Sequence, residues 1–191
     1  SSSIGIIDEY GPISLLQPPP LVVTAVVSSD YNAQDISCYG ASDAEVTMTS
    51  IGGNSLATYE INGNVVTGNV QAGLPAGLYS IDATDTLGCT VNTSVTITQP
   101  SQLIADSLVI NVSCPDANDG IISVNPSGGT PFFPAPDYFV EWDVAGVDPA
   151  YHGNSTDSLY PLGPVTGTVT VTDANGCQVV SNVEITEPDS L

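Results

Sequence analysis

The sequence contains no lysine and no arginine, although 21 of its 191 residues are acidic. Its formal net charge is −21. Nucleic acid is excluded as a partner, because phosphates are bound by cationic side chains. An anionic membrane surface is excluded for the same reason. The carboxylates must be satisfied by backbone N–H groups, hydroxyls, water or bound cations. The acidity is explained equally well by solubility or by divalent-cation binding.

Long apolar runs are also absent. The longest, LVVTAVV at residues 21–27, is far shorter than the ~20 residues that cross a bilayer, so we expect no membrane insertion. No stretch of useful length carries a helical period. The first residues, SSSIGIIDEY, lack the cationic segment of a signal peptide, and we expect the chain to be cut from a longer protein.

Catalytic motifs are missing as well. The one histidine, His152, lies in DPAYHGNS, a segment with loop composition, and is expected to be a solvated loop residue. The sequence holds no GxSxG, no P-loop and no lysine for a Schiff base. We therefore predict that the protein is not an enzyme.

What the sequence does contain is a repeat. Residues 85–100, DTLGCTVNTSVTITQP, match residues 173–188, DANGCQVVSNVEITEP, at an offset of 88. Around the first cysteine of each half, CYGASDAEV and CPDANDGII match at an offset of 76. The difference between the offsets predicts a 12-residue insertion in the second half, between Gly129 and Leu162. Internal repeats of this length are typical of modular arrays.

Each repeat reads as β structure. GTVTVTD at 167–173 alternates valine with threonine, the period of a half-buried strand, and YSIDATD at 79–85 places Tyr79, Ile81 and Ala83 on one face. Short strands separated by Gly and Pro turns, in units of about 80–90 residues, predict an all-β fold of tandem immunoglobulin-like β-sandwiches. The expected domains are 1–20 (the final strand of a preceding repeat, seen as ISLLQP at 13–18, plus a Pro-rich linker), 21–100 and 101–191.

The four cysteines fall two to a repeat. None belongs to a CxxC pair and only one histidine is present, which argues against a zinc site. We expect one disulfide per repeat, Cys38–Cys89 and Cys114–Cys177, and hence an oxidising compartment.

Acidic turns are the candidate cation sites. DANDG at 116–120 begins like an EF-hand loop but lacks the glycine and glutamate that this loop needs later, so that interpretation fails. A looser calcium site would use Asp116, Asn118 and Asp119, with Asp173 and Asn175 in the matching turn. Hairpin capping by Asx turns is the favoured interpretation of all these residues.

Aromatic residues gather in the insertion. Within it, the stretches 131–143 and 148–159 hold all three phenylalanines, the only tryptophan and two of the eight tyrosines, namely Phe132, Phe133, Tyr138, Phe139, Trp142 and Tyr151. Exposed rings of this kind stack on sugars or fill a partner's pocket, which makes Phe132, Phe133, Tyr138 and Trp142 candidate ligand-binding residues. The alternative places Tyr138, Val140 and Trp142, alternate residues of YFVEW, in a core strand and is favoured for Trp142.

The order of these motifs resembles the SprB repeat of Bacteroidota cell-surface adhesins. The second unit carries CPDANDGIISVNPSGGTP, DYFVEW and TVTVTDANGCQVVSNVEITEP, and the first carries LPAGLYSIDATDTLGC and VTITQP. The first unit lacks the tryptophan, and the second has Gly167 where the first has a tyrosine. The resemblance implies a long, repetitive, extracellular surface protein, exported by the type IX system and linked to adhesion or gliding motility.

The resemblance also implies O-glycosylation, because Bacteroidota modify Ser or Thr in Asp-Ser/Thr-aliphatic triplets. Four such triplets occur, and they predict glycans on Thr86, Ser107, Ser158 and Ser190.

We therefore expect a structural and adhesive stalk segment whose partners are neighbouring repeats and surface polysaccharide. Two alternatives are a carbohydrate-binding module that uses the aromatic insertion, and a filament subunit joined by strand addition through residues 13–18.

Overall fold

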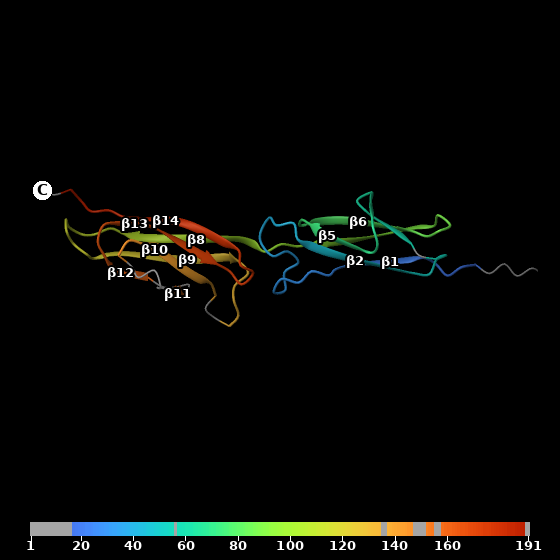
Figure 1. The fold of residues 1–191 in the computed structure, drawn as a ribbon, viewed down its shortest axis with the longest axis horizontal. Helices are drawn as coiled ribbons and strands as arrows, with labels where there is room; N and C mark the ends of the chain where they lie inside the picture. The colour runs from blue at the N-terminus through green and yellow to red at the C-terminus, as the bar shows by residue number, and fades with distance from the viewer. Residues whose placement is uncertain (1–16, 56, 135–136, 147–151, 155–157, 190–191) are drawn as a thin grey trace, which may run out of the picture.

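The computed structural model describes residues 17–55, 57–134, 137–146, 152–154 and 158–189 of the chain. These residues form two elongated modules placed end to end, the first blue to green and the second yellow to red in Figure 1. Every regular element among them is a β-strand, so the all-β prediction is confirmed. The described part contains no helix that could cross a membrane.

The first module has seven strands, which alternate with Gly-, Asn- and Pro-containing turns. Their bounds are β1 (Val22–Val27), β2 (Ala44–Ile51), β3 (Thr58–Ile61), β4 (Asn64–Val66), β5 (Val70–Leu74), β6 (Gly77–Thr84) and β7 (Thr90–Ile97). They make a three-stranded sheet in the order β1-β2-β5 and a four-stranded sheet in the order β4-β3-β6-β7.

The second module repeats this plan. Its strands are β8 (Ser101–Ile110), β9 (Gly120–Gly129), β10 (Phe139–Val144), β11 (His152–Asn154), β12 (Ser158–Leu162), β13 (Val165–Thr172) and β14 (Gln178–Ile185). The sheet orders β12-β9-β8 and β11-β10-β13-β14 match those of the first module strand for strand. All pairings are antiparallel, and seven strands divided in this way form an immunoglobulin-like sandwich, as the strand pattern predicts.

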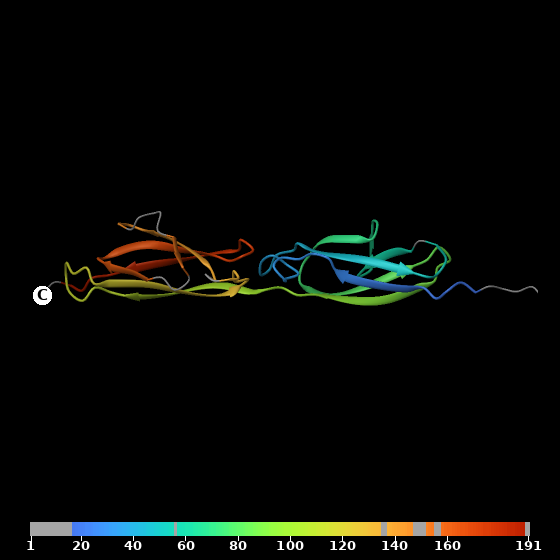
Figure 2. The same cartoon turned by 90° about the horizontal axis from the view of Figure 1, so that it is seen from below.

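Each sandwich has its own core, built from the alternating apolar residues of its strands. In β6, Tyr79, Ile81 and Ala83 point inward, as the sequence period predicts. In β13 the equivalent residues are Gly167, Val169 and Val171, and both valines are fully buried. Among the described residues, none belongs to both cores. Only three residues separate β7 from β8, and among them Pro100 is buried. Figure 2 shows the chain passing directly from one module to the other.

The 12-residue insertion is divided over two loops of the second module. Strand pairing aligns Val140 with Tyr59, because Val140 lies opposite Val171 and Tyr59 opposite the equivalent Ala83. Five of the extra residues therefore lie before β10 and seven lie between β10 and β12. The same alignment puts Trp142 where the first module has Ile61, inside the core.

The GG pair of each repeat is explained by a close approach of the backbone. A Cβ on Gly128 would lie 1.9 Å from the carbonyl oxygen of Gln102, and one on Gly129 would lie 2.5 Å from the Asp173 carboxylate. Both glycines also have positive φ. Only glycine can bring the end of β9 this close to β8 and to the turn that carries Asp173.

The expected strand at residues 13–18 lies mostly outside the described residues. Of its members only Gln17 and Pro18 are described, and both are exposed. The carbonyl oxygen of Pro19 accepts a hydrogen bond of 2.8 Å from the N–H of Gly53. The linker therefore lies against the first module from residue 19 onward.

Candidate functional site: the joint between the modules

The turn between β13 and β14, residues 173–177, is one half of the joint. Asp173 is buried, and its carboxylate accepts hydrogen bonds from the N–H groups of Thr130, Asn175 and Cys177 at 2.8–3.0 Å. The N–H of Asp173 donates to the carbonyl of Cys177, and Gly176 adopts positive φ. This is an Asx turn that holds Cys177 at the start of β14.

The loop between β1 and β2 is the other half. Within it, the N–H of Ala41 donates to the carbonyl of Cys38 at 3.0 Å, and both the N–H and the hydroxyl of Ser37 donate to the Asp43 carboxylate. The N–H of Gly40 donates to the side chain of Gln99 at 2.9 Å, which ties the loop to the residues that follow β7. Cys38 is therefore held at the end of the first module that faces the second.

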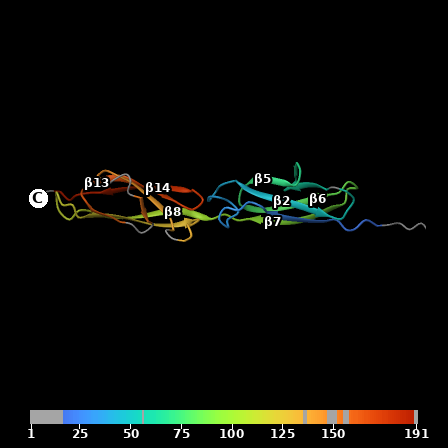
Figure 3. The same ribbon diagram turned by 60° about the horizontal axis from the view of Figure 1, so that its bottom comes forward.

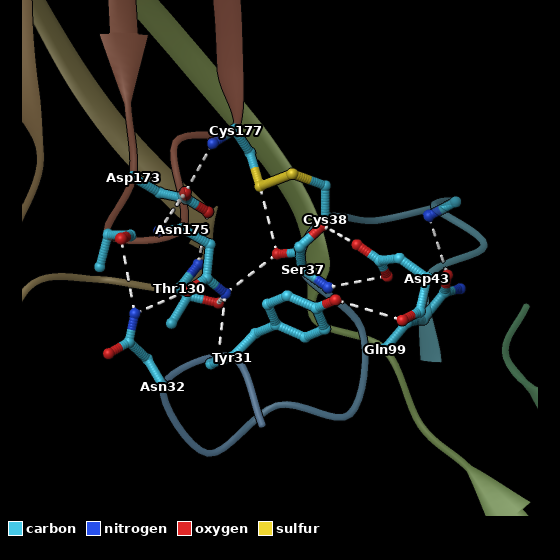
Figure 4. Close-up of a disulfide and its surroundings, with 12 residues drawn as sticks. Tyr31, Asn32, Ser37, Cys38, Asp43, Gln99, Thr130, Asp173, Asn175 and Cys177 are labelled. Atoms are coloured by element: carbon cyan, nitrogen blue, oxygen red, sulfur yellow. Dashed lines mark hydrogen bonds between the residues drawn. A yellow bond between two sulfur atoms is a disulfide. The ribbon is translucent and has the colours of Figure 1, made fainter. Parts of the chain in front are cut away.

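A disulfide joins the two halves. Cys38 of the first module is bonded to Cys177 of the second, with their Cα atoms 5.7 Å apart (Figure 4). The predicted pairs Cys38–Cys89 and Cys114–Cys177 are therefore wrong, and so is one disulfide per repeat. Cys89 and Cys114 are exposed free thiols.

Strand direction explains why the predicted pairs fail. Cys89 precedes β7, and β7 runs its full eight residues toward the joint before the chain enters the second module. At about 3.3 Å per residue this strand separates Cys89 from the joint by roughly 25 Å. A disulfide requires Cα atoms within about 7 Å. The same argument excludes Cys114–Cys177, because β14 runs away from the joint and Cys114 lies at the far end of the second module.

Asn175 is the polar centre of the joint (Figure 4). Its amide nitrogen lies 3.1 Å from the carbonyl oxygen of Tyr31, 3.0 Å from that of Ser37 and 3.1 Å from Oγ1 of Thr130. Its carbonyl oxygen accepts a hydrogen bond of 2.6 Å from the amide of Asn32. One side chain of the second module thus binds three residues of the loop in the first.

The sequence interpretation missed Tyr31 and Asn32. The signal that could have found them is loop length. Ten residues separate Val27 from Cys38, whereas four separate the equivalent Val109 from Cys114. The extra residues in the first module include Tyr31 and Asn32, which supply a backbone carbonyl and an amide to Asn175. The sequence made Asn175 a candidate cation ligand, but in the structure its side chain forms hydrogen bonds with the loop of the first module.

The remaining cation candidates lie at the far end of the second module. The Asp119 carboxylate accepts the N–H of Ser113 at 2.9 Å, and hydrogen bonds from the hydroxyl and N–H of Ser113 hold the pKa of Asp119 below its usual value. Asp116 adopts positive φ in the same loop. Among the described residues, no three His, Cys, Asp or Glu side chains gather in a way that could hold a metal ion. Asp119 therefore closes its loop through Ser113, six residues earlier, and this bond is not the Asx turn that the sequence favoured.

The aromatic candidates divide into two groups. Tyr138 and Trp142 are buried in the core of the second module, and the Tyr138 hydroxyl donates to the carbonyl of Gly128 at 2.7 Å. Burial, with smaller contributions from the charges of Asp137 and Asp173, raises the pKa of Tyr138. These two residues are not available to a ligand. Phe132 and Phe133 are exposed, Phe133 by 98%. Tyr151 lies outside the described residues, as does the side chain of His152.

The predicted glycosylation sites have different surroundings. Thr86 and Ser107 are exposed, Ser158 is half-buried, and Ser190 lies outside the described residues. The Thr86 hydroxyl donates to the carbonyl of Asn54 at 2.6 Å, a hydrogen bond that a glycan on this oxygen would remove. Ser107 lies in β8, an edge strand whose only pairing partner in its sheet is β9.

Two comparisons with known proteins give matches. The family model described as SprB repeat matches residues 109–133, the segment from the end of β8 through β9. Among solved structures, the chain is similar to the fibronectin(III)-like modules of CbhA from Clostridium thermocellum. The identity is 11%, 86% of this chain and 94% of that chain are covered, and the TM-score is 0.32, so this similarity carries no argument here. None of the curated proteins matches the chain.

Proposed function

We propose, from the SprB repeat that the second module carries, that this chain is a load-bearing segment of the stalk of a secreted cell-surface protein. SprB repeats are associated with cell-surface proteins, and modules of this fold are typically structural rather than catalytic. The chain's role is to set the distance between its two ends and to resist bending and pulling.

The observation that carries this proposal is the disulfide between modules. Two modules joined by one peptide segment can rotate about that segment, and mobility is the usual expectation for a small interface. Here a second covalent connection, Cys38–Cys177, joins the same two modules. Asn175 adds hydrogen bonds from a half-buried position. A joint with two covalent connections and a polar clamp favours a rod.

Composition suits a rod outside the cell. The net charge of −21 favours solubility. The absence of lysine and arginine leaves no site for trypsin-like proteases. Glycans on Thr86, Ser107 and Ser158 would add protection, and Ser107 is well placed because its strand lies at a sheet edge.

Small-angle X-ray scattering tests the rod. The oxidised chain is expected to give one maximum dimension that matches the end-to-end arrangement in Figure 3. The matched variant, Cys38→Ser with Asn175→Ala, removes the disulfide and the clamp but leaves both cores intact, and its dimensions should be broadly distributed. A broad distribution already present in the oxidised wild-type chain would contradict the proposal.

A second function, carbohydrate binding, is favoured by one observation. Phe133 is 98% exposed and Phe132 is 38% exposed, in the loop before β10, which is five residues longer than the equivalent loop of the first module. Exposed aromatic rings on a loop are suited to stacking on sugar rings. Surface polysaccharide would be the ligand, and the rod would then carry an adhesive patch on its second module.

A glycan array distinguishes the two functions. Binding that is lost in Phe132→Ala/Phe133→Ala and kept in Tyr160→Ala, a matched change at another exposed ring, would support the adhesive patch. An array with no signal for the wild-type chain would leave only the stalk.

A further inference from the structure

Two cysteines take no part in the joint. Cys89 lies at the outer end of the first module and Cys114 at the outer end of the second, and both are exposed free thiols. Each occupies the repeat position of a cysteine that is bonded at the joint. Cys114 matches Cys38 at the offset of 76, and Cys89 matches Cys177 at the offset of 88.

The loop around Cys114 is built like the loop around Cys38. The N–H of Ala117 donates to the carbonyl of Cys114 at 3.1 Å, as that of Ala41 does to Cys38 at 3.0 Å. The N–H of Ser113 donates to Asp119, as that of Ser37 does to Asp43. Two further contacts match. The N–H of Asp116 donates to the Glu187 side chain, as that of Gly40 does to Gln99. The N–H of Thr186 donates to the Asn111 side chain, as that of Thr98 does to Asp35.

The turn around Cys89 is likewise built like the turn around Cys177. Asp85 is buried, and its carboxylate accepts the N–H groups of Asn54, Leu87 and Cys89, each at 2.9 Å. The N–H of Asp85 donates to the carbonyl of Cys89 at 2.9 Å, as that of Asp173 does to Cys177 at 3.0 Å. The outer ends of the two modules therefore carry the same turn and the same kind of loop that meet at the central joint.

We propose that Cys114 and Cys89 are halves of further joints, each forming a disulfide with another module of the same fold docked end to end. Cys114 pairs forward with the turn cysteine of the following module. Cys89 pairs backward with the loop cysteine of the preceding module. The contact is head to tail, and because the modules lie end to end it extends into a fibre instead of closing into a ring. This inference deepens the stalk function and rests on it.

The bond forms by thiol–disulfide exchange with a small disulfide oxidant such as oxidised glutathione. The thiolate of one cysteine attacks the oxidant, which gives a mixed disulfide and releases one glutathione thiol. The thiolate of the docked cysteine then attacks the protein sulfur of the mixed disulfide and releases the second thiol. Two protein thiols are oxidised, one oxidant disulfide is reduced, and their two protons pass to the two glutathione thiols.

The outer joints differ from the central one in their polar clamp. Leu87 stands where the second module has Asn175, and it is 69% exposed. At the outer end of the second module the equivalent loop is shorter and has no counterparts of Tyr31 and Asn32. Ile110, which lies just before this loop, is 49% exposed. The turn face thus has the apolar Leu87 in place of the Asn175 amide, and the loop face lacks the residues equivalent to Tyr31 and Asn32 that this amide would bind. In a second copy of this chain the two faces are complementary.

Overlap of the bonds gives the fibre a mechanical property that separate modules lack. The central bond encloses residues 38–177, and the proposed bonds leave from residues 89 and 114, both inside that interval. Where consecutive modules belong to one polypeptide, every residue of the fibre then lies inside at least one disulfide loop. The covalent path between the two outer bonds runs only from Cys89 to Cys114, roughly 85 Å when fully extended, so unfolding of a module cannot unravel the fibre.

A tandem chain tests the pairing. Pro188 of one full copy is joined directly to Pro19 of a second copy, which reproduces the spacing of Pro100 and Ser101 at the central joint. The tandem has eight cysteines. After oxidation with glutathione, we expect three disulfides and two free thiols, with Cys114 of the first copy bonded to Cys89 of the second by peptide mapping.

The matched control replaces Cys114 of the first copy with serine and should give two disulfides and three free thiols. The Cys38–Cys177 bond within each copy reports that both copies have folded. The proposed disulfide between modules would be overturned by four free thiols in the folded tandem. It would also be overturned if Cys114 of the first copy and Cys89 of the second each formed a mixed disulfide with glutathione. That result would leave the rod itself intact, because scattering from the single chain tests the rod independently.

Discussion

The Cys38–Cys177 bond should control how far the chain extends when it is pulled from its ends. With handles at Gln17 and Asp189, the disulfide shields everything between residues 38 and 177, a separation of 139. Twenty-one residue steps precede the bond and twelve follow it. At about 3.5 Å per step, the oxidised chain cannot exceed roughly 120 Å even if both modules unfold.

Reduction removes this limit. The 172 steps between the handles then extend to roughly 600 Å, so breaking one bond should add about 480 Å of length. Single-molecule force spectroscopy measures this as the contour length before and after addition of a reductant. The chain should carry Cys89→Ser and Cys114→Ser, so that only the central bond responds.

The control is Cys38→Ser in the same background, which should show the full length without reductant. Equal contour lengths for oxidised and reduced chains would refute the pairing. Two unfolding events of about 240 Å each in the oxidised chain would refute it too, because they are the expected signature of modules that are not bridged.

The remaining predictions concern the two turns, the ions and the glycans. Hydrogen bonds from the N–H groups of Cys89 and Asn54 hold the pKa of Asp85 below its usual value. The Asp85 carboxylate therefore stabilises the fold above about pH 4, and this stabilisation is lost as pH falls through the folded-state pKa. The melting temperature of the first module should fall less between pH 4 and pH 2 in Asp85→Asn than in the wild type. Asp173→Ala leaves buried N–H groups without their acceptor and should destabilise the second module by about 3 kcal/mol in a denaturant titration, against less than about 0.5 kcal/mol for the exposed Asp143→Ala. Millimolar calcium should leave the melting temperature unchanged relative to equal ionic strength of sodium chloride, and a specific rise abolished by Asp116→Asn would instead establish a calcium site. Native material should exceed 19.5 kDa by intact mass through glycans at Thr86, Ser107 and Ser158, and a mass equal to the bare chain would exclude them.

Much of the fold follows from local patterns that the sequence displays directly. The alternation in residues 79–85 and 167–173 identified buried faces that the structure confirms in Ile81, Ala83, Val169 and Val171. The Asp-x-x-Gly-Cys motif indicated a turn, and the turn is there in both modules. These features depend on residues close together in the chain, and that is why the sequence alone is sufficient to predict them.

By itself the sequence determined that the chain is a repeat of β-sandwiches with two cysteines in each unit, because strand period, turns and repeat offsets are properties of neighbouring residues. Only the tertiary structure decided which cysteines meet. Pairing depends on which end of a sandwich each turn occupies, and that follows from strand direction over the whole module rather than from the count per repeat. Cys38 and Cys177 belong to different repeats yet face each other, since β7 carries the chain through the joint and β13 returns to it. Trp142 and Asn175 were decided in the same way, one by packing in the core and the other by contact across the joint.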